Sequence, residues 1–567
     1  MRSLLLVLAL LGAPVFAAPR VAVPPIAPAN RGMVSAADPR AAQAGREILR
    51  AGGSAADAEI AMMFALTVVE PQSSGIGGGG YFVHRDAQGR VETIDGRETA
   101  PAAARPDRFT GPDGKPLPFA KAFPGGKSVG IPGNIRLAEM AHARWGRLPW
   151  ARLLQPAIRL ASQGFAVSAS TSRYAGVVAP LWKDFPAIAA LYATDGAAKP
   201  VGTIVRNPAL AALLRQVAAQ GPDGFYAGAN AEAIATAVSS APVSPVPFTR
   251  DDLAGYRARL QPPVCGTYRG YRVCGMAPSS SGGVAILQML GMLERFDMKA
   301  LGPDSPIAWH LIGEAMQLAY ADREQYLGDA AFGTVPVAGL LDPGYLAKRA
   351  ALIEPTRALG RYEPGAPAGA PVRTPGTGVD EHGTTDFVAA DAAGDVVTMT
   401  STVEGLFGSQ LVANGYVLNN ELTDFSFAPE KAGAPVANRV EAGKRPLSSM
   451  SPTIVTGPDG RLRLAVGSAG GKRIIMHVLK TLVGVIDWGM SAQDAVALPN
   501  IYFDASAGTL LVEKTPRMDR LAPVMSGYGQ QVVETDLGSK LNAIERLPDG
   551  RWRGAADPRS EGVALAE

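Results

Sequence analysis

The chain has 567 residues, which corresponds to roughly two to four ordinary domains or to one unusually large one. With 47% hydrophobic and 19% charged residues it can bury a substantial core, which excludes a mainly disordered chain. The net charge of +3 gives no electrostatic case for a nucleic-acid partner. The five histidines lie far apart and no His/Cys ligand spacing occurs, so we expect no metal centre.

The first residues have the pattern of a targeting signal. Arg2 supplies a positive charge, Leu4–Leu11 form an apolar stretch, and 15–17 form a small-residue cleavage pattern. Because the apolar run is too short to span a bilayer, residues 1–17 are interpreted as a signal peptide, with a buried N-terminal helix as the alternative. We therefore expect a periplasmic or secreted protein whose mature form has no membrane span.

The next part of the chain predicts helices followed by a strand pair. Two helices are expected over 37–50 and 54–69, and the second is apolar on most faces, which predicts burial. Strands over 81–83 and 91–94 are suited to pair with each other. Residues 130–240 have mainly helical patterns, interrupted by Gly and Pro.

The two cysteines fall in a segment, 264–274, that is typical of a β-hairpin. Pairing Tyr268 with Tyr271 places Cys265 opposite Cys274. Such a non-hydrogen-bonded pair has Cα atoms about 4.5 Å apart, at the short end of disulfide geometry. An oxidising compartment would permit the bond, and two unbonded cysteines are the alternative.

A second hairpin is predicted after a Pro/Gly/Ala-rich stretch, 362–375, which we expect to be an exposed linker. Strands near 387–391 and 396–402 are joined by a three-residue loop that contains a glycine. This register places Thr384 opposite Thr402. Ordinary threonine pairing on a sheet is one explanation of that arrangement.

The other explanation is chemical. If the bond between Gly383 and Thr384 is cut, Thr384 gains a free α-amine with a pKa of about 8. Such an amine can act as general base for the hydroxyl of its own residue, without a histidine. The scarcity of histidine is compatible with this mechanism.

Glycine-rich segments are also candidates for binding. Gly467–Gly471 follows a predicted strand and precedes an apolar helix, where backbone N–H groups favour negative charge. The spacing to Lys472 is one residue short of a Walker A loop, so phosphate binding of that type is not indicated. Like Gly75–Gly80 and Pro278–Gly283, this segment is equally suited to a tight strand-to-helix turn.

Several charged and hydroxyl residues lie in predicted turns. Taken singly, each is typical of a surface turn or a helix cap. Taken together they suit a zwitterionic ligand, with an arginine for a carboxylate and acids for an ammonium. The residues concerned are Arg97, Glu421, Asp424, Ser448 and Ser449.

A series of ordered motifs then points to a family. From about residue 33 to 562 the chain resembles the gamma-glutamyltranspeptidases, or glutathione hydrolases, of the N-terminal nucleophile hydrolase superfamily. The motifs are Gly77–Gly80, Asp95–Glu98, Pro278–Gly283, Gly383–Asp386, Leu418–Phe425, Pro446–Thr453, Gly467–Arg473 and Asp557–Arg559. The resemblance implies an α+β fold, a four-layer αββα sandwich. It also implies a proenzyme that cleaves itself into a large subunit, 18–383, and a small subunit, 384–567, which stay together as a heterodimer.

The resemblance also implies roles for individual residues. Thr384 matches the nucleophile, Thr402 its hydrogen-bonding neighbour, and Gly470 with Gly471 the oxyanion hole. The carboxylate-binding positions match Arg97, Ser448 and Ser449, and the positions that hold the α-amino group match Glu421 and Asp424. The implied reaction attacks a γ-glutamyl amide such as glutathione and passes the acyl group to water or an amino acid. No cofactor is expected.

The chain departs from the family pattern in two places. The family often has Asn at the position of Glu404, where it helps to bind the α-amino acid end of the substrate. The stretch 425–444 is shorter than in members with a lid over the site, and it lacks the tyrosine of that lid. Related glutaryl-cephalosporin acylases share the fold, so an acylase for another side chain is the alternative function. A binding-only relative would lack the nucleophile, and Thr384 is present.

Overall fold

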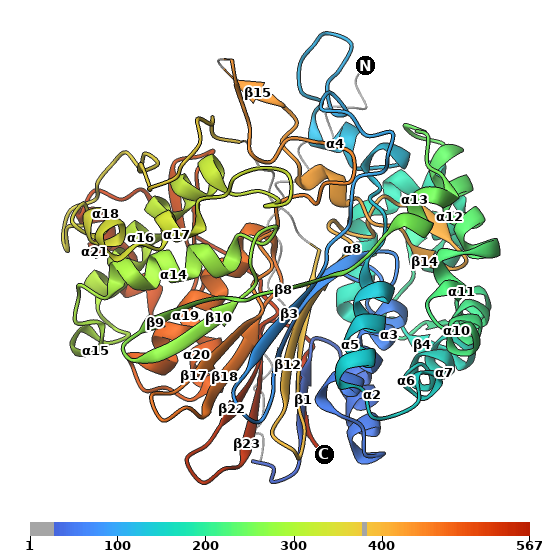
Figure 1. Ribbon diagram of the computed structural model, residues 1–567, viewed down its shortest axis with the longest axis horizontal. Coiled ribbons are helices and arrows are strands. Elements are labelled where there is room, and N and C mark those ends of the chain that lie inside the picture. The colour runs from blue at the N-terminus through green and yellow to red at the C-terminus, as the bar shows by residue number, and fades with distance from the viewer. Residues whose placement is uncertain (1–27, 377–382, 432) are drawn as a thin grey trace.

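The computed structural model describes residues 28–376, 383–431 and 433–567. The predicted signal peptide, 1–17, and the residues just before Gly383 lie outside these ranges. Two β-sheets occupy the centre of the molecule, and helices cover the outer face of each (Figure 1). Within the described ranges, none of the helices combines the length and the apolar character needed to cross a bilayer.

The described residues form one seven-stranded and one six-stranded antiparallel sheet. The first has the order β24 (Val563–Ala566), β1 (Met33–Ala36), β11 (Thr385–Ala390), β12 (Val396–Thr402), β2 (Gly79–Arg85), β3 (Val91–Gly96) and β8 (Arg259–Gln261). The second has the order β23 (Trp552–Ala556), β22 (Asn542–Arg546), β18 (Leu462–Gly467), β17 (Thr453–Thr456), β10 (Tyr271–Gly275) and β9 (Val264–Tyr268). Both sheets combine strands from before and after the Gly383–Thr384 bond.

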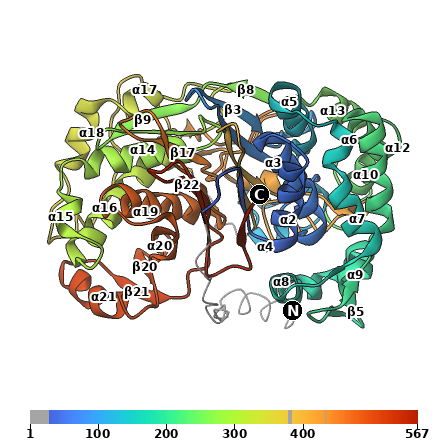
Figure 2. The ribbon, with the colours of Figure 1, turned by 90° about the horizontal axis from the view of Figure 1, so that it is seen from below.

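Helices from separate parts of the chain cover the two sheets. Figure 2 shows the layers from below, with α3 and α19 on opposite sides of the paired sheets. On the side of the first sheet lie α2 (Pro39–Arg50), α3 (Ala55–Val69), α5 (Asn134–Trp145), α7 (Gln155–Gln163), α8 (Ala169–Val178), α10 (Pro208–Gln220) and α12 (Gly228–Ser239). On the side of the second lie α14 (Gly282–Leu293), α15 (Met298–Leu301), α16 (Pro306–Tyr326), α18 (Pro343–Ala350), α19 (Ile474–Ile486), α20 (Ala492–Ala497) and α21 (Met518–Gly527). The predicted αββα sandwich is confirmed.

Side-chain alternation on β11 shows how the layers are built. Phe387 and Ala389 belong to the core under the helices of the first sheet, whereas Val388 and Ala390 belong to the core between the two sheets. All residues of β11 are buried. A strand that is buried on both faces can have apolar residues at successive positions, as 387–390 do, which explains its weak polar–apolar alternation in the sequence.

The predicted helices near the N-terminus are confirmed with small shifts at their starts. Helix α2 begins at Pro39 because Asp38 is its N-cap and accepts from the Arg40 N–H. Helix α3 begins after Ser54, which forms a capping box with Asp57. Every residue of α3 is buried, as its apolar faces predict.

The linker prediction for 362–375 needs a correction. Much of this segment runs over the surface, but it is anchored on α16 instead of being freely exposed. The Tyr362 hydroxyl donates to Glu314 at 2.5 Å, and the Gly365 N–H donates to Asp322 at 2.7 Å. The reason is that buried acids of α16 accept hydrogen bonds from the segment, which composition alone does not reveal.

The cysteine hairpin has the predicted register. Tyr268 pairs with Tyr271, and Cys265 lies opposite Cys274 with a Cα–Cα distance of 4.2 Å. The two cysteines form a disulfide. Both turn residues, Arg269 and Gly270, have positive φ, as a tight two-residue hairpin turn requires.

The disulfide predicts a redox-dependent stability. It closes a short loop with a sequence separation of 9, and the loop-entropy estimate for such a crosslink is about 2–3 kcal/mol. Replacing both Cys265 and Cys274 with Ala should lower the free energy of unfolding by that amount, measured by urea denaturation. Wild-type protein treated with a reductant should have the same free energy of unfolding as the variant. Equal free energies of unfolding for the oxidised wild type, the reduced wild type and the variant would contradict the prediction.

Candidate active site

The predicted pairing of Thr384 with Thr402 is confirmed. Thr385 pairs with Ser401 on β11 and β12, and the Thr384 Oγ1 lies 3.3 Å from Thr402 Oγ1 just beyond that pair. The Thr384 hydroxyl also donates to the carbonyl oxygen of Gly383. Thr402 Oγ1 accepts from the Glu404 N–H at 2.7 Å, which fixes its position. A buried hydroxyl thus lies against the peptide bond that precedes it.

A lysine that sequence reasoning missed lies next to Thr384. Lys540 Nζ forms an ion pair with Glu70, donates to Ser73 Oγ at 2.7 Å, and lies 3.4 Å from the Thr384 carbonyl oxygen. It lies in a loop between β21 (Val532–Thr535) and β22 without a recognisable motif. Because it is 156 residues away from Thr384, only the tertiary structure brings the two together.

The glycine-rich loop after β18 begins beside the strand of the nucleophile. A Cβ on Gly467 would lie only 2.0 Å from Asp386 Oδ2, so glycine is required for this contact between β18 and β11. Gly470 and Gly471 have φ values of 123° and 61°, a region that favours glycine. Ser468 Oγ lies 3.0 Å from His477 Nδ1, which ties the loop to the first turn of α19. The two predicted oxyanion-hole residues therefore lie in a loop that is fixed to the N-terminal end of α19.

The predicted ligand-binding charges form one buried cluster. Arg97 forms ion pairs with both Glu421 and Asp424, and its guanidinium also donates to the carbonyl oxygens of Pro446 at 3.2 Å and Leu447 at 3.1 Å. The interpretation of these residues as surface turns is wrong, since Arg97 is only 1% exposed. The structure places the arginine and the acids in direct contact, an arrangement that the zwitterion hypothesis did not specify.

Glu404 connects this cluster to the threonine pair. It is buried, has a φ of 75°, and accepts a hydrogen bond from the Asn420 side chain. Asn420 also accepts from the Gly405 N–H at 2.8 Å, a role that sequence reasoning missed although the residue lies in a recognised motif. Burial raises the pKa of Glu404 well above its ordinary value, and the charge of Asp424 raises it further.

Two other acids of the cluster titrate abnormally. Burial raises the pKa of Glu421 well above its ordinary value, with added repulsion from Glu98, against the opposing charge of Arg97. Burial raises the pKa of Glu98 to about 7, again against the attraction of Arg97. Of these acids, Glu98 can therefore exchange a proton near neutral pH.

The two predicted carboxylate-binding serines are buried and their hydroxyls accept hydrogen bonds. Ser448 Oγ accepts from the Met450 N–H at 3.2 Å, and Ser449 Oγ accepts from Arg323 Nη2 at 2.8 Å. A serine hydroxyl that accepts one bond still has its own proton to donate. Both serines can therefore donate to an anionic group, and Arg323 is a further contributor that sequence reasoning missed.

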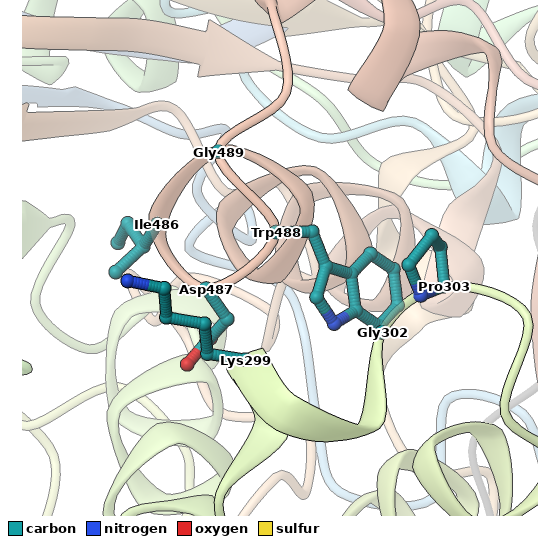
Figure 3. A pocket seen from close by; sticks show the side chains of 7 residues that line it. All are labelled: Lys299, Gly302, Pro303, Ile486, Asp487, Trp488 and Gly489. Atoms are coloured by element: carbon teal, nitrogen blue, oxygen red, sulfur yellow. The ribbon is translucent and has the colours of Figure 1, made fainter.

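A surface pocket of about 340 Å³ lies elsewhere on the molecule (Figure 3). It is lined by Lys299, Gly302, Pro303, Ile486, Asp487, Trp488 and Gly489, none of which is a predicted site residue. The pocket lies at the C-terminal end of α19, about 20 Å along the helix from the glycine loop at its start.

Comparison with known proteins identifies the family of the chain. The family described as gamma-glutamyltranspeptidase matches residues 41–567. This chain belongs to the gamma-glutamyltranspeptidase family. The glutathione hydrolase proenzyme of Escherichia coli (strain K12) is 37% identical over 546 residues, which covers 94% of this chain and 91% of that protein.

Relatives with another name are similarly close. The acylase ACY 1 proenzyme of Pseudomonas sp. (strain SE83) is also 37% identical over 546 residues. The match covers 95% of this chain and 94% of the acylase. The crystal structure of cephalosporin acylase from Bacillus halodurans superposes with a TM-score of 0.85 at 26% identity, covering 97% of this chain and 98% of that one. The N-terminal nucleophile hydrolase fold is thereby established.

The raised pKa of Glu98 predicts a pH-dependent stability. Because the pKa rises from 4.5 to about 7 on folding, the stabilisation from the bound proton is complete below about pH 4.5 and is lost as the pH rises through 7. Glu98→Gln, which stays neutral, should therefore gain about 3 kcal/mol relative to wild type between about pH 5 and pH 8. Denaturant unfolding at several pH values measures this difference, with Glu92→Gln on β3 as control. A constant difference across the range would contradict the prediction.

Proposed function

We propose that this protein is an exported, self-processing threonine enzyme that cleaves γ-glutamyl amides such as glutathione. The acyl group passes through a γ-glutamyl-enzyme ester to water, an amino acid or a peptide. The observation that carries the proposal is the position of Thr384, whose hydroxyl contacts the Gly383 carbonyl and lies 3.3 Å from Thr402 Oγ1. Membership of the gamma-glutamyltranspeptidase family supports it.

Self-cleavage would use the contact between Thr384 and Gly383. The Thr384 oxygen attacks the Gly383 carbonyl carbon, the C–N bond breaks, and the nitrogen takes up the hydroxyl proton as it becomes an amine. Water then hydrolyses the ester, which leaves a new carboxyl terminus at Gly383 and a free amine on Thr384. The fragments 18–383 and 384–567 stay joined because both contribute strands to each sheet.

Turnover would use the same hydroxyl with the new amine as its base. The amine takes the hydroxyl proton, and the oxygen attacks the γ-carbonyl of the donor. The backbone N–H groups of Gly470 and Gly471 stabilise the negative charge on the carbonyl oxygen. The leaving amine takes up the proton, and water or an acceptor amine then attacks the ester. Thr402 holds the attacking oxygen through the contact described above.

The charged cluster is suited to a zwitterionic donor. A γ-glutamyl group has an α-carboxylate and an α-ammonium on one carbon, and these can replace the internal partners of Arg97 and of the acids. The carboxylate of the ligand would bind Arg97, Ser448 and Ser449. Its ammonium would lie among Glu421, Asp424 and Glu404. An exchange of ion pairs costs less than binding either charge alone, because no buried charge loses its partner.

Export is part of the proposal. It rests on the signal-peptide pattern of residues 1–17 and on the Cys265–Cys274 disulfide, which is suited to an oxidising compartment. Several relatives are proenzymes, which is consistent with cleavage of a precursor. We therefore propose that the protein is periplasmic or secreted.

A glutaryl or cephalosporin acylase is the second candidate. It is favoured by the acylase ACY 1 relative at 37% identity and by the acylase structure with a TM-score of 0.85. Glu404 bears on the choice, because burial raises its pKa and so disfavours the charged form that would hold an ammonium. The difference between the two functions therefore lies in whether the acids at this end of the site bind an ammonium.

Self-cleavage is tested directly on purified protein. Wild type should separate into two bands on a denaturing gel, and sequencing of the smaller fragment should begin at Thr384. Thr384→Ala should stay intact and inactive, because it has no hydroxyl to attack Gly383. Thr398→Ala, another buried threonine of the same hairpin, should still be cleaved. An uncut wild-type chain that turns over substrate would refute the mechanism.

The donor is tested by comparing a γ-glutamyl anilide with its glutaryl analogue. Removal of the α-amino group should cost about 2–5 kcal/mol in kcat/KM, because the buried acids lose their partner. Steady-state kinetics with both anilides on the same preparation measures the difference. Equal or faster turnover of the glutaryl compound would favour the acylase.

A further inference from the structure

One face near the C-terminal end of α16 contacts two loops of the site at once. Tyr320, Arg323 and Glu324 have the spacing i, i+3 and i+4, which places them on the same side of the helix. Arg323 is buried, with only 3% of its surface exposed. The two loops are the serine loop, 446–451, and the oxyanion loop, 468–473.

Arg323 holds the serine loop through two hydroxyls. Its Nη2 donates to Ser449 Oγ at 2.8 Å, and its Nε donates to Ser281 Oγ at 2.9 Å. Ser281 in turn donates its hydroxyl to the Ser448 carbonyl oxygen at 2.7 Å and its N–H to the same oxygen at 2.8 Å. One planar guanidinium thereby positions both serines and leaves the Ser449 proton free to be donated.

The other two residues of this face hold the oxyanion loop at Lys472, the residue after Gly471. The Tyr320 hydroxyl donates to the Lys472 carbonyl oxygen at 2.5 Å, and Lys472 Nζ donates to Glu324 Oε1 at 3.1 Å. Arg323 Nη1 lies 2.5 Å from the same Glu324 oxygen and so joins the two sets of contacts. Although burial acts in the opposite direction, the charges of Lys472 and Arg323 lower the pKa of Glu324, which keeps it ionised.

We propose that Arg323 is a positioning residue and that this face of α16 sets the distance between the carboxylate end and the carbonyl end of the acyl donor. This inference rests on the proposed function, in which Ser448 and Ser449 bind the carboxylate and Gly470 and Gly471 the carbonyl oxygen. Because both loops are held by adjacent turns of one rigid helix, their separation cannot adapt to a shorter acyl group. The site therefore selects a γ-glutamyl donor over a β-aspartyl donor, which is one carbon shorter.

The arrangement also predicts which kinetic constant each contact controls. Loss of Arg323 releases the serine loop and so weakens donor binding. Loss of the Tyr320 hydroxyl removes one of the two contacts that hold the oxyanion loop at Lys472. In the proposed function this loop acts on the transition state. Within the described ranges, the hydrogen bonds of Thr384, Thr402 and Gly383 join them to each other, to Glu404 and to Lys540. We therefore expect both variants to be cleaved.

The experiment compares Arg323→Met with wild type on γ-glutamyl and β-aspartyl anilides. We expect KM for the γ-glutamyl donor to rise about 10- to 100-fold, with kcat changed less than about 3-fold. The preference for γ-glutamyl over β-aspartyl in kcat/KM should fall at least about 10-fold. Tyr320→Phe should lower kcat about 3- to 10-fold with little change in KM.

Arg349→Met is the matched control. Arg349 is also a buried arginine packed against α16, but its Nη2 donates to the carbonyl oxygens of Leu318 at 2.9 Å and Glu363 at 3.0 Å. Its loss should affect stability and leave KM and donor preference unchanged. Self-cleavage of each variant, followed on a gel, reports whether it has folded.

The outcomes separate this inference from the proposed function. If wild type turns over γ-glutamyl anilide and Arg323→Met keeps its KM and donor preference, the role of Arg323 is refuted alone. If wild type shows no γ-glutamyl turnover, the proposed function is refuted and the inference with it. Should Arg323→Met not accumulate, Arg323→Lys provides the same test, because one ammonium cannot reproduce the planar fork to both serines. A raised KM then supports the proposal, and an unchanged KM overturns it.

Discussion

The site depends on the register of β11 within the first sheet. This strand begins at Thr385 and pairs with β1 on one side and β12 on the other, and both of its faces are buried. A slip of one residue would move every side chain of the strand to the opposite face. The apolar residues that alternate between the two cores forbid such a slip, and they thereby hold the Thr384 hydroxyl against Gly383 and Thr402.

The same packing explains how the protein could be cut and remain one molecule. The bond before Thr384 lies just before the first residue of β11. The strands that flank the β11–β12 pair, β1 and β2, come from the part of the chain before this bond. Cutting one peptide bond leaves the ladder hydrogen bonds and both cores in place. The new terminus is then held by the sheet, so the amine and the hydroxyl of Thr384 start in a fixed geometry.

Burial of the charged cluster carries a large desolvation cost. Arg97 and its acids lose hydration on burial, and this cost is offset by their direct contact and by the hydrogen bonds from Arg97 to two backbone carbonyl oxygens. Such a cluster contributes little to stability. In the proposed function its internal ion pairs are exchanged for those with a zwitterionic donor. Glu404 extends the cluster toward the threonine pair through Asn420 and the backbone of residue 404. The charged cluster and the threonine pair are therefore connected by contacts among residues 402, 404 and 420.

Local patterns in the sequence determined the hairpins, the early helices and the Thr384–Thr402 and Cys265–Cys274 pairs, because registers and caps depend on neighbouring residues. The ordered motifs indicated the family and the αββα layers. Only the tertiary structure decided that Arg97 contacts its acids directly, that the linker is anchored on α16, and that Lys540 and Arg323 reach the site. These contacts join residues that are far apart in sequence, and their geometry depends on the packing of the whole sandwich, which no local pattern records.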